Sequence, residues 1–185
     1  MENPWKTLKS TVVYENPWIV VHEDTVIRPD GTKGMYSVVD TVGSAAVFIV
    51  ALTDHEQILL IGQFRYPTAM YSWELPGGGT GGKDPLEAAK LELQEETGYV
   101  AKEWQKIGTL QSMNGISSEI EHVFIAQGLT KTSEHKQAEE GITASKLVSI
   151  REALRMISSG DINDAQTIAA LSIALLYLKG TQFGL

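Results

Sequence analysis

The chain has 185 residues, a length that suits one domain and is sufficient to bury a hydrophobic core. Its formal net charge of −8 at pH 7 argues against a protein that coats nucleic acid, because phosphate contacts need a surplus of lysine and arginine. The chain has no cysteine, which excludes disulfides, zinc–thiolate sites and cysteine nucleophiles.

No segment of the sequence predicts a membrane span. Residues 1–10 (MENPWKTLKS) lack the apolar core of a signal peptide, and the longest apolar stretches, 45–52 and 168–178, are too short or too interrupted to cross a bilayer. We therefore expect a cytoplasmic protein that has neither nucleic acid nor a membrane as a partner.

The first part of the chain predicts strands. Residues 11–14, 18–27 and 35–41 are rich in β-branched and aromatic residues, and Pro29-Asp30-Gly31 predicts a turn before the last of them. Two apolar runs, 45–52 and 58–65, follow with a short polar link, which indicates a buried hairpin. A short extended segment, 73–75, then leads into the glycine-rich stretch 77–82.

A helix is predicted next. Asp84 is the expected N-cap, Pro85 the first helical residue and Glu87 the third, and Gly98 is expected to end the helix. Further strands are expected at 104–113 and 121–126, and amphipathic helices at 149–157 and 165–178. Helices that flank a mixed sheet predict an α/β/α sandwich.

Three glutamates of this helix share one face. Glu92, Glu95 and Glu96 are three or four residues apart, so they lie together on a helix surface. A solvated acidic stripe is the usual origin of such a pattern, but no lysine or arginine lies three or four positions from any of them. Like charges at this spacing destabilise a helix, so a bound cation is the better explanation. Ligands that are all oxygens favour Mg²⁺ or Mn²⁺.

The glycine-rich stretch has a competing explanation. Residues 77–83 nearly match a phosphate-binding P-loop, but Asp84 replaces the serine or threonine that should reach Mg²⁺. A flexible turn is another alternative, because ordering so many glycines in one conformation has a large entropic cost. Close approach of the backbone to a ligand or metal would explain why the glycines are present.

Loop and helix together resemble the Nudix box, G-x5-E-x7-R-E-U-x-E-E-x-G-U, in which U is aliphatic or aromatic. Gly77 matches the opening glycine, and the positions that match in register on the helix are Glu92, Leu93, Glu95, Glu96, Gly98 and Tyr99. Lys83 and Leu91 stand where the family has glutamate and arginine, which commonly form an ion pair that braces the loop. Because both partners are changed, neither charge is stranded, and the resemblance implies a metal site with different bracing.

The resemblance extends to the ADP-ribose and nucleoside diphosphate sugar hydrolases of this superfamily. The segments that carry it are 63–67, 73–76, 114–119, 139–142 and 160–167. Gln166 departs from the lysine of these relatives. The resemblance implies a Nudix-like α/β/α sandwich with a mixed sheet, with an N-terminal strand segment over 1–42 and a hydrolase domain over 43–180. The implied reaction is Mg²⁺-dependent cleavage of a nucleoside diphosphate sugar or ADP-ribose to a nucleoside monophosphate and a sugar phosphate.

A nucleotide-binding regulator with a degenerate Nudix box is the alternative function. For the hydrolase, we expect Glu92 and Glu96 to be the main metal ligands, Glu95 to share a second ion, and a carbonyl near Pro76–Gly77 to complete one shell. The resemblance favours Glu140 as the general base, with Glu139 and Glu119 as the next candidates; a solvated turn is the alternative for the first two.

Substrate contacts are expected from Arg65, Glu74 and Tyr66. A guanidinium suits a phosphate or acid group, although a surface salt bridge would also explain Arg65. Trp73 or Tyr66 could stack on a base or belong to the core. The N-terminal strands bear Trp5, Trp18 and Tyr36, which is more apolar surface than a lone hairpin should expose. Related proteins use this segment to dimerise, so we expect a homodimer.

Overall fold

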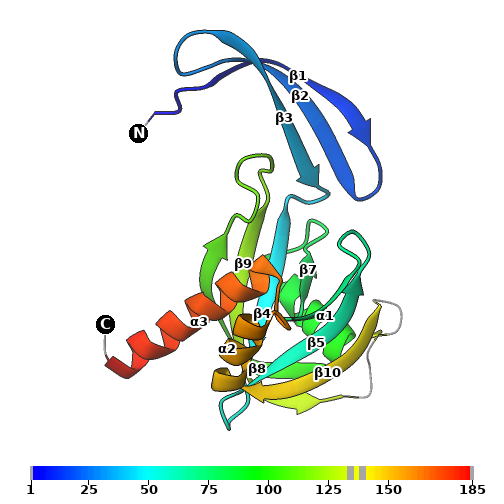
Figure 1. Ribbon diagram of the computed structural model, residues 1–185, viewed down its shortest axis with the longest axis vertical. Coiled ribbons are helices and arrows are strands. Elements are labelled where there is room, and N and C mark those ends of the chain that lie inside the picture. Colours follow the sequence, from blue (N-terminus) through cyan, green and yellow to red (C-terminus); the bar gives the residue numbers. More distant parts are fainter. Residues whose placement is uncertain (1, 133–135, 138–140, 184–185) are drawn as a thin grey trace.

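The computed structural model describes residues 2–132, 136–137 and 141–183, without the side chains of 181–183. Its N-terminal part is a separate antiparallel sheet in the order β1–β2–β3. The strands are β1 (Lys6–Glu15), β2 (Ile19–Ile27) and β3 (Lys33–Thr41), and they project from the rest of the chain (Figure 1). All three were predicted, although β1 begins earlier than residue 11.

The other described residues form two sheets and three helices. One sheet has the order β10–β5–β6 and the other β7–β4–β9–β8. The pair β4–β9 is parallel and the other pairs are antiparallel. The elements are β4 (Ala45–Ala51), β5 (Gln57–Arg65), β6 (Met70–Glu74), β7 (Gly77–Gly79), α1 (Pro85–Thr97), β8 (Tyr99–Leu110), β9 (Ile120–Lys131), β10 (Ile142–Ser149), α2 (Ile150–Ser159) and α3 (Ala165–Phe183).

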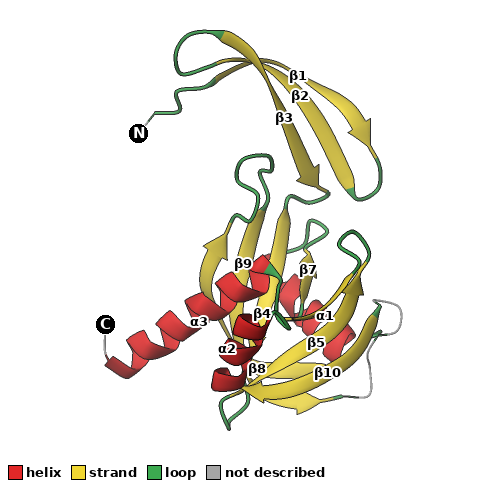
Figure 2. Cartoon of the chain, viewed as in Figure 1, coloured by secondary structure: helices red, strands yellow, loops and turns green. Residues whose placement is uncertain are grey.

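Alternate side chains of β4 enter two different buried clusters. One cluster joins Ile49 to Leu93 of α1, and the other joins Val50 to Met156 of α2 and Leu171 of α3. Helix α1 therefore covers one face of the sheet, and α2 and α3 cover the opposite face (Figure 2). The predicted α/β/α sandwich with a mixed sheet and preceding N-terminal strands is confirmed.

Helix α1 begins and ends where the sequence predicts. The Asp84 carboxylate accepts hydrogen bonds from the backbone N–H groups of Leu86 at 2.9 Å and Glu87 at 3.2 Å. At the other end, Gly98 has φ 71°, a left-handed conformation that glycine adopts without strain, and its N–H donates to the Gln94 carbonyl. These caps set the two ends of the helix. The burial of Leu93 identifies the side of the helix that faces the sheet.

Helices α2 and α3 were also predicted. The Ser149 hydroxyl caps α2 by accepting from the Glu152 N–H at 3.2 Å, and Gly160 ends it with φ 83°. Helix α3 continues to Phe183, beyond the predicted end at residue 178. Of the helices in the described part of the chain, none is both long and apolar enough to cross a membrane.

The predicted hairpin of 45–52 with 58–65 is wrong. Both runs are strands, but β4 and β5 lie in different sheets, and among the described residues only the isolated bridge Leu52–Ile58 pairs this stretch. Strand β4 instead pairs in parallel with β9, while β5 pairs with β10, which the sequence did not predict as a strand. Apolar runs indicate burial, but they do not select a pairing partner.

The N-terminal sheet is attached to the loop that precedes β9. The Tyr36 hydroxyl donates to the Gly115 carbonyl at 2.7 Å, and the Val39 N–H donates to the Ile116 carbonyl at 2.7 Å. The Asp40 carboxylate accepts from the Ser118 N–H at 2.9 Å and from its hydroxyl at 2.8 Å. Strand β3 is thus held along most of this loop.

Candidate metal and substrate site

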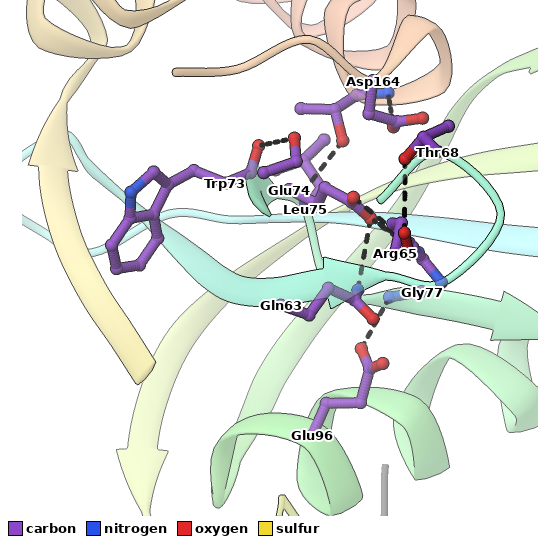
Figure 3. A network of polar contacts seen from close by, with 11 residues as sticks. Gln63, Arg65, Thr68, Trp73, Glu74, Leu75, Gly77, Glu96 and Asp164 are labelled. Atoms are coloured by element: carbon purple, nitrogen blue, oxygen red, sulfur yellow. Dashed lines mark hydrogen bonds and ion pairs between the residues drawn. The ribbon is translucent and has the colours of Figure 1, made fainter. Parts of the chain in front are cut away.

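Two glutamates of α1 face the glycine strand β7. Glu96 is buried, with 6% of its surface exposed, and its Oε2 accepts a hydrogen bond from the Gly77 N–H at 2.8 Å. Figure 3 shows the Glu96 side chain reaching from α1 to Gly77. The Glu92 carboxylate lies directly against Gly78, where a Cβ atom would come within 3.0 Å of it. The carboxylates of these two predicted ligands, both from α1, therefore lie against the same short strand.

The third glutamate of the predicted metal site has a different neighbour. Glu95 forms an ion pair with Lys136, with 2.5 Å between Oε1 and Nζ, and its carbonyl accepts from the Lys136 N–H at 2.7 Å. Lys136 follows β9, so it is not among the residues three or four positions from Glu95, where the sequence predicts helical ion-pair partners. Within the described ranges, no group of three or more histidine, aspartate or glutamate residues is arranged to hold a metal ion.

The backbone of β7 is also engaged. The Pro76 carbonyl accepts from the Ile49 N–H at 2.9 Å, and Gly77 and Gly78 pair with Phe48 and Val47 of β4. These glycines form an edge strand that runs antiparallel to β4, so the segment does not wrap a phosphate as a P-loop does. Their lack of side chains lets α1 and its carboxylates approach the backbone closely.

Thr80 ties the loop between the glycine strand and α1 to the start of β4. Its side chain is buried, its N–H donates to the Ala45 carbonyl at 2.8 Å, and its carbonyl accepts from the Lys83 N–H at 3.0 Å. The Thr80 hydroxyl oxygen accepts from the Gly82 N–H at 3.3 Å. Leu91, in contrast, is an exposed side chain. Uncharged contacts of Thr80 thus hold the loop that an ion pair would hold in the Nudix box.

Arg65 and Glu74 form an ion pair between β5 and β6. The Arg65 Nη2 lies 2.6 Å from the Glu74 Oε2, and Arg65 Nε donates to both carboxylate oxygens, at 3.2 and 3.1 Å. Gln63 Nε2 also donates to Glu74 at 3.2 Å, and Glu74 is only 3% exposed (Figure 3). The hydrogen bonds that Arg65 donates to Glu74 raise the pKa of Arg65, and the negative charges of Glu74, Asp164 and Glu96 act in the same direction. Arg65 thus remains charged beside the glutamates of α1.

A cavity of about 400 Å³ opens between this ion pair and the start of α3. Its walls include Phe48, Arg65, Glu74, Asn163, Asp164 and Gln166. Asp164 is fixed as the cap of α3, because its Oδ2 accepts from the Thr167 N–H at 2.7 Å. The cavity therefore unites two of the predicted substrate residues, Arg65 and Glu74, with a helix end far away in the sequence.

The remaining candidates lie elsewhere. Glu139 and Glu140 lie outside the described residues. Glu119 is hydrogen-bonded to the Thr41 hydroxyl at the end of β3, at the junction with the N-terminal sheet. Tyr66 is 91% exposed and does not line the cavity. Trp73 packs against the core, with the Lys146 ammonium 3.8 Å from its ring centroid, so it is a core residue.

Three residues at or near the cavity were not predicted from the sequence as site residues: Gln63, Glu121 and Phe48. Gln63 holds Glu74, and Glu121, at the start of β9, is only 1% exposed. The signal for Glu121 was available, because a charged residue that opens an apolar strand implies a buried carboxylate. Phe48 was included in an apolar run but not assigned to a site.

Comparisons with known proteins identify the family of the chain and its fold. The model of the nucleoside diphosphate sugar hydrolase N-terminal domain matches residues 5–39, and that of the NUDIX domain matches residues 43–171. The chain is similar to the ADP-ribose pyrophosphatase of Bacillus subtilis (strain 168), with 32% identity over 176 residues, covering 94% of this chain and 93% of the relative. It is also similar to the methanol dehydrogenase activator of Bacillus methanolicus, with 29% identity over 180 residues, covering 94% and 92%. The crystal structure of an ADP compounds hydrolase has the same fold, with a TM-score of 0.84 and 22% identity, over 96% of this chain and 95% of that one.

Proposed function

Because the chain belongs to the Nudix family and carries the N-terminal domain of the nucleoside diphosphate sugar hydrolases, we propose that it uses Mg²⁺ to hydrolyse ADP-ribose or a nucleoside diphosphate sugar. The products are a nucleoside monophosphate and a sugar phosphate. The observation that carries this proposal is that the carboxylates of Glu92 and Glu96 on α1 lie against β7, next to the cavity that contains Arg65 and Glu74.

The donor groups at β7 fit a hard divalent cation. They are carboxylate oxygens, and the described residues near them include no thiolate, since the chain has no cysteine. The Gly77 N–H fixes one oxygen of the buried Glu96. Nudix hydrolases use divalent metal ions; for this chain we propose Mg²⁺, with Mn²⁺ as a substitute, held by Glu92 and Glu96. Glu95 stays a proposed ligand of a second ion, and to serve as one it must release Lys136.

The chain's own residues provide orientation and proton transfer. A bound divalent ion neutralises diphosphate charge and makes a water molecule more acidic. Arg65, held by Glu74, presents its guanidinium to the cavity and binds a phosphate oxygen of the substrate. Glu140 remains our proposed base, ahead of Glu139. Glu119 is the weakest of the three candidates, because its hydrogen bond to Thr41 already occupies it.

The decisive experiment measures turnover of ADP-ribose, ADP-glucose, GDP-mannose and UDP-glucose with Mg²⁺, coupled to a phosphatase. Glu96→Gln should lower kcat by at least about a hundredfold, because it removes ligand charge while it keeps the side-chain shape. Glu103→Gln, at an exposed position on β8, is the matched control and should behave as the wild type. Wild-type turnover by Glu96→Gln would contradict the assignment of Glu96 as a metal ligand. A pH–rate comparison of Glu140→Gln with Glu119→Gln separates the two base candidates.

The N-terminal sheet supports the proposal of a homodimer. Its exposed large apolar side chains exceed what a small sheet can leave in water: Trp5, Leu8, Val12, Val13, Tyr14, Trp18, Met35 and Tyr36. A second copy of the chain would cover them. Light scattering should give the mass of a dimer at micromolar concentration, and a monomer mass would contradict this proposal.

A nucleotide-binding regulator is the second candidate. It is favoured by the loss of the charged brace at Lys83 and Leu91, and one similar protein carries the name of an activator. Nucleotide binding without turnover of any substrate in the panel would establish the regulator and exclude the hydrolase.

A further inference from the structure

A tight turn joins the N-terminal sheet to the hydrolase domain. Thr41 ends β3, the Ser44 N–H donates to the Thr41 carbonyl at 3.0 Å, and β4 begins at Ala45. Gly43 has φ 94° and Ser44 has φ 48°, so two consecutive residues have left-handed backbone conformations. A serine adopts this conformation only where the surrounding contacts offset its cost. The connection is therefore a fixed turn and not an extended linker.

Hydrogen bonds hold this turn to both parts of the chain. The Val42 N–H donates to the Trp18 carbonyl, beside the start of β2, at 3.0 Å. The Ser44 carbonyl accepts from the N–H of Ile120, the first residue of β9, at 3.1 Å. The position of the turn therefore depends on the N-terminal sheet as well as on the hydrolase domain.

Gly43 packs directly against the backbone of the loop before α1. A Cβ atom at Gly43 would lie 2.7 Å from the Gly82 backbone nitrogen and 3.4 Å from the Gly81 carbonyl carbon. Both neighbours are backbone atoms, which cannot turn aside as the end of a flexible side chain can. A residue without a Cβ atom is therefore needed for the turn and the loop to come this close.

The loop at Gly82 connects the two elements of the proposed metal site. It follows β7, against which the carboxylates of Glu92 and Glu96 lie. It leads to Asp84, which caps α1. The Gly82 N–H donates to the Thr80 hydroxyl at 3.3 Å. A displacement of Gly82 therefore acts on a hydrogen bond of this loop and on the start of the helix that carries both carboxylates.

We propose that Gly43 is a positioning residue for the metal site. It lets the turn at the end of the N-terminal sheet seat the loop before α1, and it thereby sets the affinity of Glu92 and Glu96 for a divalent cation. The inference rests on the proposed function, because it takes these glutamates to be metal ligands. Gly43 acts through Gly82 and not by contact with the ion. The N-terminal sheet thus has a mechanical connection to the metal site, besides its proposed part in the dimer.

Gly31 is the matched control for a substitution at Gly43. It lies in the turn between β2 and β3 with φ 84°, and a Cβ atom there would meet no atom of the described residues within 4 Å. Alanine at either position adds the same kind of backbone strain, but only at Gly43 does it also meet the Gly82 backbone. Asparagine adopts the left-handed conformation more readily than alanine. Gly43→Asn and Gly31→Asn therefore repeat the comparison with less strain if Gly43→Ala does not fold.

Binding of Mn²⁺ to the full chain without substrate is measured by electron paramagnetic resonance. Glu96→Gln identifies the signal of this site, because it should abolish it. The Gly43 variants should raise the Kd for Mn²⁺ about tenfold, the lower end of the effect of removing a group that supports a metal ligand. The matching Gly31 variants should keep the wild-type Kd. Hydrogen exchange of the Gly82 N–H, followed by nuclear magnetic resonance, should be faster in the Gly43 variants only, and thermal unfolding shows that each variant is folded.

The outcomes separate this inference from the proposed function. Equal Mn²⁺ affinity in the Gly43 and Gly31 variants, or unchanged exchange of the Gly82 N–H, would overturn the inference. The expected loss of Mn²⁺ affinity in the Gly43 variants, together with no hydrolysis of any substrate by the wild-type chain, would support the inference and remove the hydrolase function. Hydrolysis by the wild-type chain, together with unchanged Mn²⁺ affinity in the Gly43 variants, would keep the hydrolase and remove the inference.

Discussion

Three consecutive glycines in β7 have different surroundings, and alanine substitutions there test the role of Glu92. A Cβ atom at Gly78 would lie 3.0 Å from the Glu92 carboxylate, so that carboxylate must move by a few tenths of an ångström. Gly78 has no left-handed φ, so alanine adds no backbone strain. A displacement of about 1 Å at a catalytic group costs on the order of a hundredfold, so we expect Gly78→Ala to lower kcat about tenfold. Its free energy of unfolding should change by less than about 1 kcal/mol.

The neighbouring glycines provide two controls, one that should leave stability unchanged and one that should lower it. Nothing lies within 4 Å of a Cβ atom at Gly79, so Gly79→Ala should keep the wild-type kcat and Tm. A Cβ atom at Gly77 would lie 2.2 Å from the Val47 carbonyl oxygen, which is rigid backbone. Gly77→Ala should therefore destabilise the fold by about 1–3 kcal/mol or more. Only the substitution at Gly78 is expected to separate activity from stability.

The assay combines kcat over a Mg²⁺ titration with thermal unfolding of each variant. The expected pattern for Gly78→Ala is a weaker apparent Mg²⁺ affinity and a lower kcat at an unchanged Tm. If Gly78→Ala and Gly79→Ala had the same kcat and the same Mg²⁺ dependence, the placement of Glu92 would have no bearing on metal binding. The proposed ligand pair would then be wrong.

Three further predictions concern the surroundings of the site. Glu74→Gln removes the charge that holds Arg65. It should lower the free energy of unfolding by about 1–2 kcal/mol, because Arg65 is half exposed, and thermal unfolding measures this loss. It should also raise KM in steady-state kinetics, and an unchanged KM would refute the role of the pair. Asp84→Ala removes two hydrogen bonds at the start of α1 and should lower stability by about 1 kcal/mol, or Tm by about 2–4 °C, with no shift expected in the exposed control Glu103→Gln. The pKa of Glu121 is raised in the folded chain, so the folded state binds its proton more tightly than the unfolded state, and stability falls as pH rises through that folded pKa. The Tm of Glu121→Gln relative to the wild type should therefore increase from about pH 4 toward neutral pH, and a pH-independent difference would contradict the assignment.

The sequence predicted features that depend on local chemistry. The cap Asp84, the terminating Gly98 and the spacing of the glutamates determine helix α1 without reference to the rest of the chain. The distance in sequence from Gly77 to these glutamates then matched the Nudix box and linked the helix to the glycine-rich segment. These patterns act over a few residues, so they can be identified in the sequence alone.

Features that depend on distant pairing were not predictable in the same way. The apolar pattern of β4 is the same whether its neighbour is β5 or β9, and the parallel pairing with β9 arises from packing. Lys136 reaches Glu95 from another part of the chain, so inspection of helical neighbours made Glu95 look uncompensated. The cavity likewise joins β5 and β6 to the start of α3, and only the folded chain brings them together.

The attachment of β3 to the loop before β9 has a consequence for the order of events during synthesis. Strands β1 to β3 pair with their neighbours in sequence, so this sheet can form as soon as it leaves the ribosome. Its hydrogen-bonding partners Gly115, Ile116 and Ser118 are translated only after β4 to β8. A nascent chain that ends before this loop therefore carries a paired sheet that lacks its hydrogen-bonding partners, and its position relative to the hydrolase domain becomes fixed only after the loop has been synthesised.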